Sequence, residues 1–157
     1  PLAGVAAGLM SAPEGKRRLL LGFLKGKRKD DVVRLCDDFA AVISRNLKRN
    51  ALKILEKYRS DGYENVIVSA SAGMWIRPWA EKTGLIDRVV TTEIELIGDP
   101  VSDILYAEPN CKGREKVERI SRIFSPRESY YIEAYGDSEA DLPMLGYADK
   151  AFFKALR

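Results

Sequence analysis

From residue 66 onward, short apolar runs typical of buried β-strands alternate with segments of helical periodicity. Strands are expected over 66–68, 89–92, 130–135 and 151–153, with helical segments between them. Strands and helices that alternate in this way indicate a parallel, doubly wound, Rossmann-like sheet. The stretch 93–110 contains Gly98-Asp99-Pro100 and predicts a hairpin or an irregular excursion instead. The fold class is therefore α/β.

The first sixty residues have a different pattern, with helical segments only. A short helix is expected over 15–26, a longer one beginning at Asp30 or Asp31, and a third over 50–58. Either aspartate can cap the longer helix, because its carboxylate accepts the free backbone N–H groups of the first turn. The sequence therefore predicts a helical unit set before the sheet.

The segment 136–145, Gly-Asp-Ser-Glu-Ala-Asp-Leu-Pro-Met-Leu, bears most directly on function. It follows an expected strand, so Asp137 should lie at the carboxyl edge of the sheet, where open α/β sheets bind ligands. Asp141 should lie near the first helical turn, so both carboxylates can face one small volume. Two hard oxygen ligands suit Mg²⁺. Ser138 followed by Asp141 also fits a helix-capping box, and that structural interpretation stays open at this point.

Two further segments are expected beside that edge. Ser69 ends the first strand, and its hydroxyl and the following backbone N–H, that of Ala70, could hold a phosphate oxygen. Lys112 precedes a helix, where its charge could neutralise phosphate. Together with Asp137 and Asp141 these residues form the set that a Mg²⁺-dependent phosphoryl-transfer site needs. Taken singly, Ser69 could be a turn former and Lys112 a solvated surface lysine.

Composition narrows the possible chemistry. Histidine is absent from the 157 residues, which excludes a Ser-His triad, a His general base and a His-ligated metal. Cys36 and Cys111 are too few for a disulfide framework or a structural zinc site, and a reduced, cytoplasmic setting is the simplest interpretation. No apolar run is long enough to cross a bilayer. Catalysis would therefore depend on carboxylates, Lys, Ser or a hard metal.

The net charge of +3 hides an uneven distribution. Residues 1–60 hold 14 Lys and Arg against 6 Asp and Glu, whereas the remainder holds 12 against 17. Nucleic-acid binding is weakly supported, because no stacking aromatics lie among the basic clusters. A solvated helix surface is the favoured interpretation. The alternative is an interfacial helix that contacts an anionic membrane through Leu19-Leu20-Leu21 and Phe23-Leu24, flanked by Lys and Arg.

Three segments together resemble motifs of the haloacid dehalogenase superfamily, in its phosphoserine-phosphatase-like branch with a helical cap. They are 66–71 for the second motif, Lys112-Gly113 for the third and 136–145 for the fourth. The resemblance covers essentially the whole chain, with residues 1–48 in the position of the cap and 49–157 as the core.

The resemblance implies a Mg²⁺-dependent phosphatase that acts on a small phosphorylated substrate, with a role for each matched residue. Ser69 would hydrogen-bond the transferring phosphoryl group, and Lys112 would balance its charge. Asp137 would ligate Mg²⁺, and Asp141 would act through Lys112 or a metal-bound water. The family's nucleophile is an aspartate on the first strand, which forms an aspartyl-phosphate.

That first motif, Asp-x-Asp-x-Thr or Asp-x-Asp-x-Val, is absent from the chain. The resemblance places its strand in the middle of the sheet, between the strands at 66–68 and 130–135, which would otherwise expose unpaired edges. We therefore predict roughly 30–40 further residues upstream of residue 1, which would carry the nucleophile. On this view residues 1–157 alone are inactive.

Two other functions remain open on the sequence. An inactive member of the family could keep Ser69, Lys112 and Asp137 as a phosphate-binding or regulatory module. If the basic helical unit contacts a membrane, the substrate could instead be a lipid phosphate.

Overall fold

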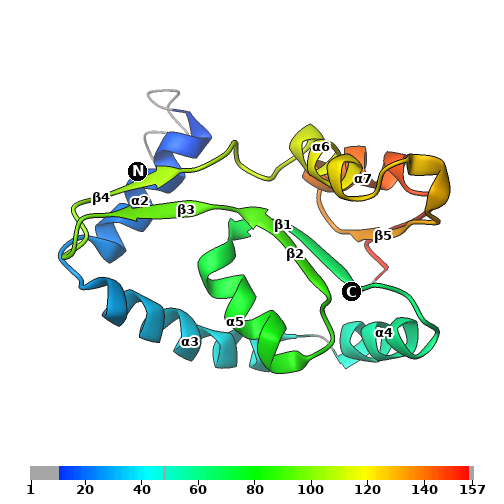
Figure 1. The fold of residues 1–157 in the computed structure, drawn as a ribbon, viewed down its shortest axis with the longest axis horizontal. Coiled ribbons are helices and arrows are strands. Elements are labelled where there is room, and N and C mark those ends of the chain that lie inside the picture. Colours follow the sequence, from blue (N-terminus) through cyan, green and yellow to red (C-terminus); the bar gives the residue numbers. More distant parts are fainter. Residues whose placement is uncertain (1–10, 48, 156–157) are drawn as a thin grey trace.

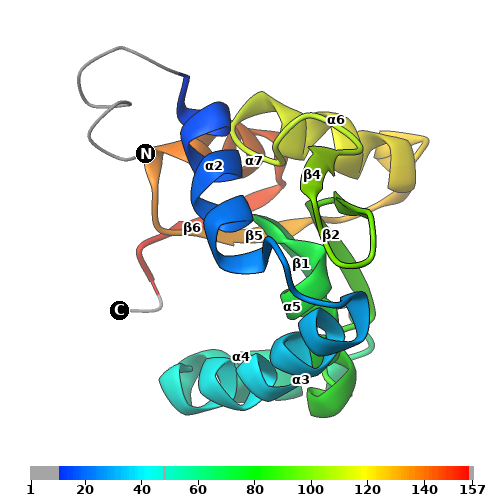
Figure 2. The same cartoon turned by 90° about the vertical axis from the view of Figure 1, so that its left-hand side faces the viewer.

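The computed structural model describes residues 11–47 and 49–155. Helices cover both faces of two parallel strand pairs. Helices α6 and α7 lie on one face, and α4 and α5 on the other, with α3 packed against α5 (Figure 1, Figure 2). The helices are α2 (Ala12–Leu24), α3 (Lys29–Asn46), α4 (Arg49–Ser60), α5 (Gly73–Thr83), α6 (Arg114–Ile123) and α7 (Leu142–Tyr147), with short 3₁₀ turns η1 (Arg127–Ser129) and η2 (Glu139–Asp141). None of the described helices is long and apolar enough to cross a bilayer.

The strands form three pairs. Parallel pairing joins β1 (Val66–Ala72) to β2 (Arg88–Thr92) and β5 (Glu133–Gly136) to β6 (Lys150–Phe153). Figure 2 shows these four in the spatial order β6, β5, β1, β2. The excursion expected over 93–110 is an antiparallel hairpin of β3 (Ile94–Ile97) and β4 (Asp103–Tyr106). The α/β prediction is confirmed, and the hairpin is the one antiparallel pair in the described part of the chain.

Three apolar clusters hold these layers together. The first joins α2 and α3 to the hairpin, the second joins α6 and α7 to β5, and the third joins α3 to α5. Their buried members are Val32, Cys36, Val101 and Ile104; Ile120, Ala134, Met144 and Leu145; and Ala40, Trp79 and Ala80. Because α3 contributes to both the first and the third cluster, it ties the helical unit to the sheet.

Strands β1 and β5 each pair on one side only, within the described residues. Between them runs a groove of about 560 Å³, which we call the interstrand groove. Its walls are mostly apolar and include Val66, Val68, Ile120, Ala134 and Met144. The groove therefore separates the two parallel pairs and is flanked by one unpaired edge of each.

The strand expected from Tyr130 begins later, at Glu133, and that prediction is wrong over its first three residues. Tyr130 and Tyr131 are exposed, and a 3₁₀ turn precedes them. The reason is local: the N–H of Ile132 donates to the Asp149 carboxylate at 2.7 Å, and the ladder with β6 starts only after it.

The expected cap of α3 is also different. The helix begins at Lys29, so Asp30 and Asp31 lie inside its first turn, and the residue before it, Arg28, makes no side-chain cap. Instead Asp99, in the turn of the hairpin, accepts the N–H of Lys29 at 3.1 Å. The cap is supplied by a residue 70 positions away, which local sequence does not reveal.

Candidate active site

Ser69 lies where the ladder between β1 and β2 becomes irregular. Pairing is regular up to Ser69, opposite Thr91, and then shifts so that Ala72 lies opposite Thr92. Within this bulge the N–H of Ser71 donates to Ser69 Oγ at 3.1 Å. The carbonyl of Ala70 accepts from Thr92 Oγ1 at 2.9 Å and from the Lys16 ammonium of α2. The bulge thus fixes Ser69 at the carboxyl edge of the sheet, although β1 itself continues to Ala72.

Asp141 closes the turn that follows β5. Its Oδ2 accepts the N–H groups of Asp137 and Ser138 at 3.2 and 3.1 Å and the Ser138 hydroxyl at 2.8 Å. Both halves of the capping box are present, so the capping interpretation of the sequence is confirmed. Gly136 makes this turn possible, because a Cβ there would lie 2.5 Å from Asp141 Cβ.

The other carboxylate oxygen of Asp141 meets a lysine that the sequence interpretation did not select. Lys116 Nζ lies 2.5 Å from Asp141 Oδ1 and donates to the Val68 carbonyl at 3.0 Å. Both side chains are about nine-tenths buried. Burial alone would raise the pKa of Asp141, but the hydrogen bonds from Lys116 and Ser138 outweigh it and lower that pKa to about 2. The Asp141 carboxylate is therefore ionised over the physiological pH range.

One small cavity of about 430 Å³ brings most of the predicted residues together. Ser69, Asp137 and Asp141 line it together with Lys116. Ala70 and Lys112 are not among its lining residues, and Lys112 is exposed in the turn before α6. Three of the five predicted residues therefore lie together at the cavity. The lysine that joins them is Lys116, four residues after the predicted Lys112.

A sequence signal for Lys116 did exist. Lys116 stands four residues before Ile120 and seven before Ile123, so it shares the inward face of a helix that the sequence predicts. A lysine on an apolar helix face is almost never fully buried unless it is paired, which points to a partner carboxylate. Lys112 lies in the loop before this helix, so it is not part of that helix face.

The geometry allows an anion to be held at this cavity. An ammonium has three N–H donors, and Lys116 uses two of them on Asp141 and Val68. Among residues 11–47 and 49–155 the third has no partner, so it can bind a ligand. The Ser69 hydroxyl lines the same cavity. Asp137 is exposed at the rim. The arrangement can therefore place one oxyanion between a hydroxyl and an ammonium, beside a carboxylate.

Asp137 is the better candidate of the two carboxylates for a direct metal ligand, because both oxygens of Asp141 are engaged. Within residues 11–47 and 49–155, no group of three or more His, Cys, Asp or Glu side chains gathers in a way that could hold a metal. Mg²⁺ commonly takes only one or two protein carboxylates and fills the rest of its shell with water and substrate phosphate. Asp137 fits as one such carboxylate.

These features are those of an α/β protein with a cavity at the carboxyl edge of its parallel strands, the edge at which open α/β sheets bind ligands. The chain belongs to the family of haloacid dehalogenase-like hydrolases, which it matches over residues 1–146.

Two kinds of relative resemble the chain. The protein CicA from two strains of Caulobacter vibrioides is 29% identical over 136 residues, which cover 86% of this chain and 60% of CicA. The chain thus spans about 60% of the length of the curated relatives it matches. A protein of unknown function from Bordetella pertussis Tohama I has a similar solved structure, with a TM-score of 0.76 over 96% of this chain and 69% of that one. At 19% identity, this likeness shows the fold alone.

Proposed function

We propose that the chain is the greater part of a Mg²⁺-dependent phosphomonoester hydrolase of the phosphoserine-phosphatase-like branch, with a small phosphorylated metabolite as substrate. The observation that carries the proposal is the buried Lys116, held between Asp141 and the strand of Ser69, with one donor left for an anion. Family membership supports hydrolase chemistry in general.

The contacts support a role for each of these residues. Ser69 donates its hydroxyl proton to a phosphoryl oxygen, and Lys116 donates its third proton to another, taking the part that the sequence assigned to Lys112. Asp137 binds Mg²⁺, which would neutralise charge on the phosphoryl group. Asp141 holds the Lys116 ammonium in place.

We further propose that the nucleophilic aspartate lies on a strand that fills the interstrand groove and comes from a part of the protein outside these 157 residues. The unpaired edges of β1 and β5 offer backbone partners on both sides, and the apolar walls would bury the side chains of such a strand. Its carboxyl end would emerge between Ser69 and Asp137, which line the cavity at that edge.

The covalent chemistry at that position has two steps. The aspartate oxygen forms a bond to phosphorus as the ester P–O bond breaks, and the leaving oxygen takes a proton from solvent as the alcohol departs. Water then forms a bond to phosphorus as the bond to aspartate breaks, and one water proton returns to solvent, which releases inorganic phosphate and the free carboxylate.

Activity of the complete protein tests the proposal. We expect hydrolysis of p-nitrophenyl phosphate that requires Mg²⁺ and stops with EDTA. Asp137→Asn and Lys116→Met should each lower kcat/KM by at least about 100-fold, and Lys112→Met should leave it within about twofold. A Lys112→Met variant as impaired as Lys116→Met would contradict the assignment of the lysine.

A specific observation favours a second candidate, a phosphatase that acts on a lipid phosphate at a membrane surface. Phe23, in the last turn of α2, is 67% exposed, and Lys25, Lys27, Arg28 and Lys29, in the turn that follows and at the start of α3, are exposed as well. An exposed aromatic ring among cations suits an anionic lipid surface. Of the four leucines expected to join it, Leu20, Leu21 and Leu24 pack into the first apolar cluster instead.

Vesicle sedimentation of the complete protein separates the two candidates. If the second candidate holds, vesicles with 30% phosphatidylglycerol in phosphatidylcholine should bind the protein at ~50 mM salt, and pure phosphatidylcholine should not. Phe23→Ser with Lys27→Glu should then lower binding at least about tenfold. Equal vesicle binding by the wild type and the variant would refute membrane contact at this turn.

A further inference from the structure

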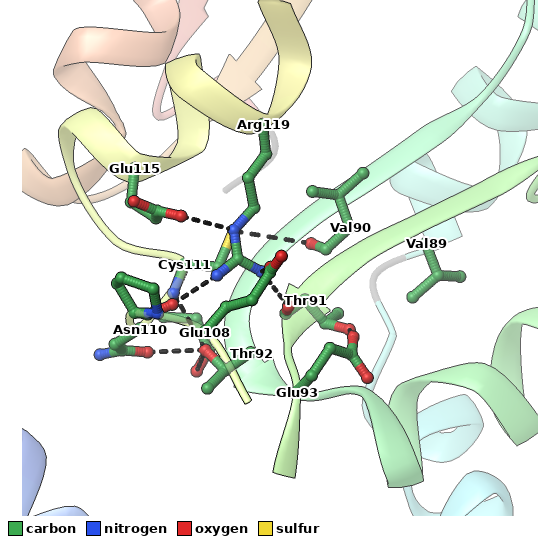
Figure 3. Close-up of polar contacts among 12 residues, drawn as sticks. Val89, Val90, Thr91, Thr92, Glu93, Glu108, Asn110, Cys111, Glu115 and Arg119 are labelled. Atoms are coloured by element: carbon green, nitrogen blue, oxygen red, sulfur yellow. Dashed lines mark hydrogen bonds and ion pairs between the residues drawn. The ribbon is translucent and has the colours of Figure 1, made fainter. Parts of the chain in front are cut away.

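Arg119 is the most completely engaged buried cation of the described chain outside the cavity. Its side chain is 7% exposed, and its guanidinium contacts two backbone carbonyls and two carboxylates. Nη1 donates to the Thr91 carbonyl at 2.6 Å and lies 3.2 Å from Glu108, Nε donates to Glu115 at 2.8 Å, and Nη2 donates to the Pro109 carbonyl. Figure 3 shows Thr91, Glu108 and Glu115 around the Arg119 guanidinium.

Those contacts join three separate parts of the fold. Thr91 lies at the carboxyl end of β2, Pro109 in the segment that enters α6, and Glu115 in the first turn of α6. A guanidinium presents several N–H donors in one rigid plane, so it can hold all three at fixed relative positions. A lysine ammonium at the same place would lack that planar fork.

The segment that enters α6 is fixed at further points. Thr92 Oγ1 lies 2.7 Å from Asn110 Oδ1 and accepts the N–H of Cys111 at 3.1 Å (Figure 3). The N–H of Gly113, which has a positive φ of 61°, donates to the Ala140 carbonyl at 3.1 Å. The start of α6 is thus tied to β2 on one side and to the Asp141 turn on the other.

Lys116 and Arg119 lie one helical turn apart on the buried face of α6. Lys116 donates to the carbonyl of Val68 on β1, and Arg119 donates to the carbonyl of Thr91 on β2. These strands are hydrogen-bonded neighbours in which Val68 pairs with Val90 and Ser69 with Thr91. Two cations of one helix therefore bind carbonyls of adjacent strands next to Ser69, and the two bonds together fix how α6 lies across the carboxyl edge.

We infer that Arg119 is a positioning residue for the cavity: it sets the place and direction of α6, and through α6 the place of the Lys116 ammonium relative to Ser69 and Asp137. The inference rests on the proposed function for its kinetic consequences. Its geometric part stands on the contacts alone.

The test uses the complete protein with Arg119→Lys, which keeps the charge and removes the fork, and Arg122→Lys as the control on the exposed side of the same helix. Arg119→Lys should lower kcat about 10- to 100-fold and change KM less than about threefold, because a displaced Lys116 still leaves the remaining substrate contacts. Glu115→Gln, a milder change, should lower kcat about two- to fivefold. Arg122→Lys should match the wild type.

A double variant distinguishes positioning from a general loss of structure. If Arg119 acts through Lys116, then Lys116→Met with Arg119→Lys should be no slower than Lys116→Met alone. Multiplied losses, or equal losses in Arg119→Lys and Arg122→Lys, would overturn the inference. Thermal unfolding of each variant sets the temperature at which all are folded.

Binding of inorganic phosphate, measured by calorimetry, separates this inference from the proposed function. Arg119→Lys should weaken phosphate binding at least about fivefold, and Arg122→Lys should not. Phosphate binding that follows this pattern in a protein without turnover would refute the hydrolase and keep the inference. The opposite result is turnover in the wild type together with wild-type phosphate binding and kcat in Arg119→Lys. That result would keep the hydrolase and refute the inference about Arg119.

Discussion

Helix α6 and the turn between α2 and α3 carry similar clusters of basic residues and use them in opposite ways. In α6, Lys116 and Arg119 point inward, and the Arg119 guanidinium and two of the three Lys116 N–H groups meet a carbonyl or a carboxylate. In the turn and at the start of α3, Lys25, Lys27 and Lys29 extend into solvent. The same residue types thus provide a fixed electrostatic site in one place and a solvated surface in the other.

The difference teaches that position relative to the apolar face, and not charge density, decides which cations of this chain are held by protein partners. A buried charge is tolerated only with close partners, and removing one partner leaves the other uncompensated. A solvated charge has no such constraint. The two regions should therefore respond very differently to the same substitution.

The largest effect is expected for Lys116→Met. The variant leaves the Asp141 carboxylate buried without its counter-charge, so the free energy of unfolding should fall by about 3 to 5 kcal/mol in urea titrations. Lys112→Met, four residues earlier and exposed, should change it by less than about 0.5 kcal/mol. Similar losses in both would break the comparison between buried and solvated cations.

The next largest loss of stability is expected for Gly136→Ala. The added Cβ would lie 2.5 Å from Asp141 Cβ and 3.2 Å from its Cγ, so the capping turn must move away from Lys116. We expect a loss of about 2 to 3 kcal/mol, again from urea titration. Gly146→Ala is the matched control, because a Cβ at Gly146 meets nothing within 4 Å.

The acid dependence of stability should reveal the ion pair of Lys116 and Asp141. The pKa of Asp141 is about 2 in the folded protein and ordinarily 3.8, so the pair stabilises the fold fully above pH 4 and loses this contribution as the pH falls toward 2. The contribution amounts to about 2 kcal/mol. Asp141→Asn should be less stable at pH 7 and should lack this part of the acid dependence; an acid profile parallel to that of the wild type would contradict it.

The smallest effect belongs to the turn between α2 and α3. Lys27→Ser should alter the free energy of unfolding by less than about 0.5 kcal/mol, because the side chain is exposed. Its backbone carbonyl still accepts the N–H of Val101, so the turn keeps its shape. A loss above 1 kcal/mol would show that solvated and buried cations are less distinct than the contacts indicate.

Much of the fold was accessible from local pattern. Strand and helix alternation predicted the α/β class, and the placement of Ser69, Asp137 and Asp141 at strand ends brought all three to one cavity. Such predictions succeed where a property is decided by neighbours in sequence, as in the capping turn after β5.

The missed features depend on distant residues. Asp99 caps α3 across 70 positions, and Asp149 decides where β5 begins. Lys116 shows a third kind of failure, because its periodicity was visible but its carboxylate partner lies 25 residues further along the chain. In each case the deciding contact joins elements that meet only after folding.

The double use of Asp141 has a consequence for how such sequences diverge. Its carboxylate both closes the turn before α7 and anchors Lys116, so a copy of the protein that no longer needs to catalyse anything would still lose stability if either residue changed. Selection for folding alone would keep the pair. Asp137 contributes only its backbone N–H to that turn, and its carboxylate is exposed at the rim. If the proposed function holds, Asp137 is therefore the residue whose retention among descendants of this chain would report continued chemistry.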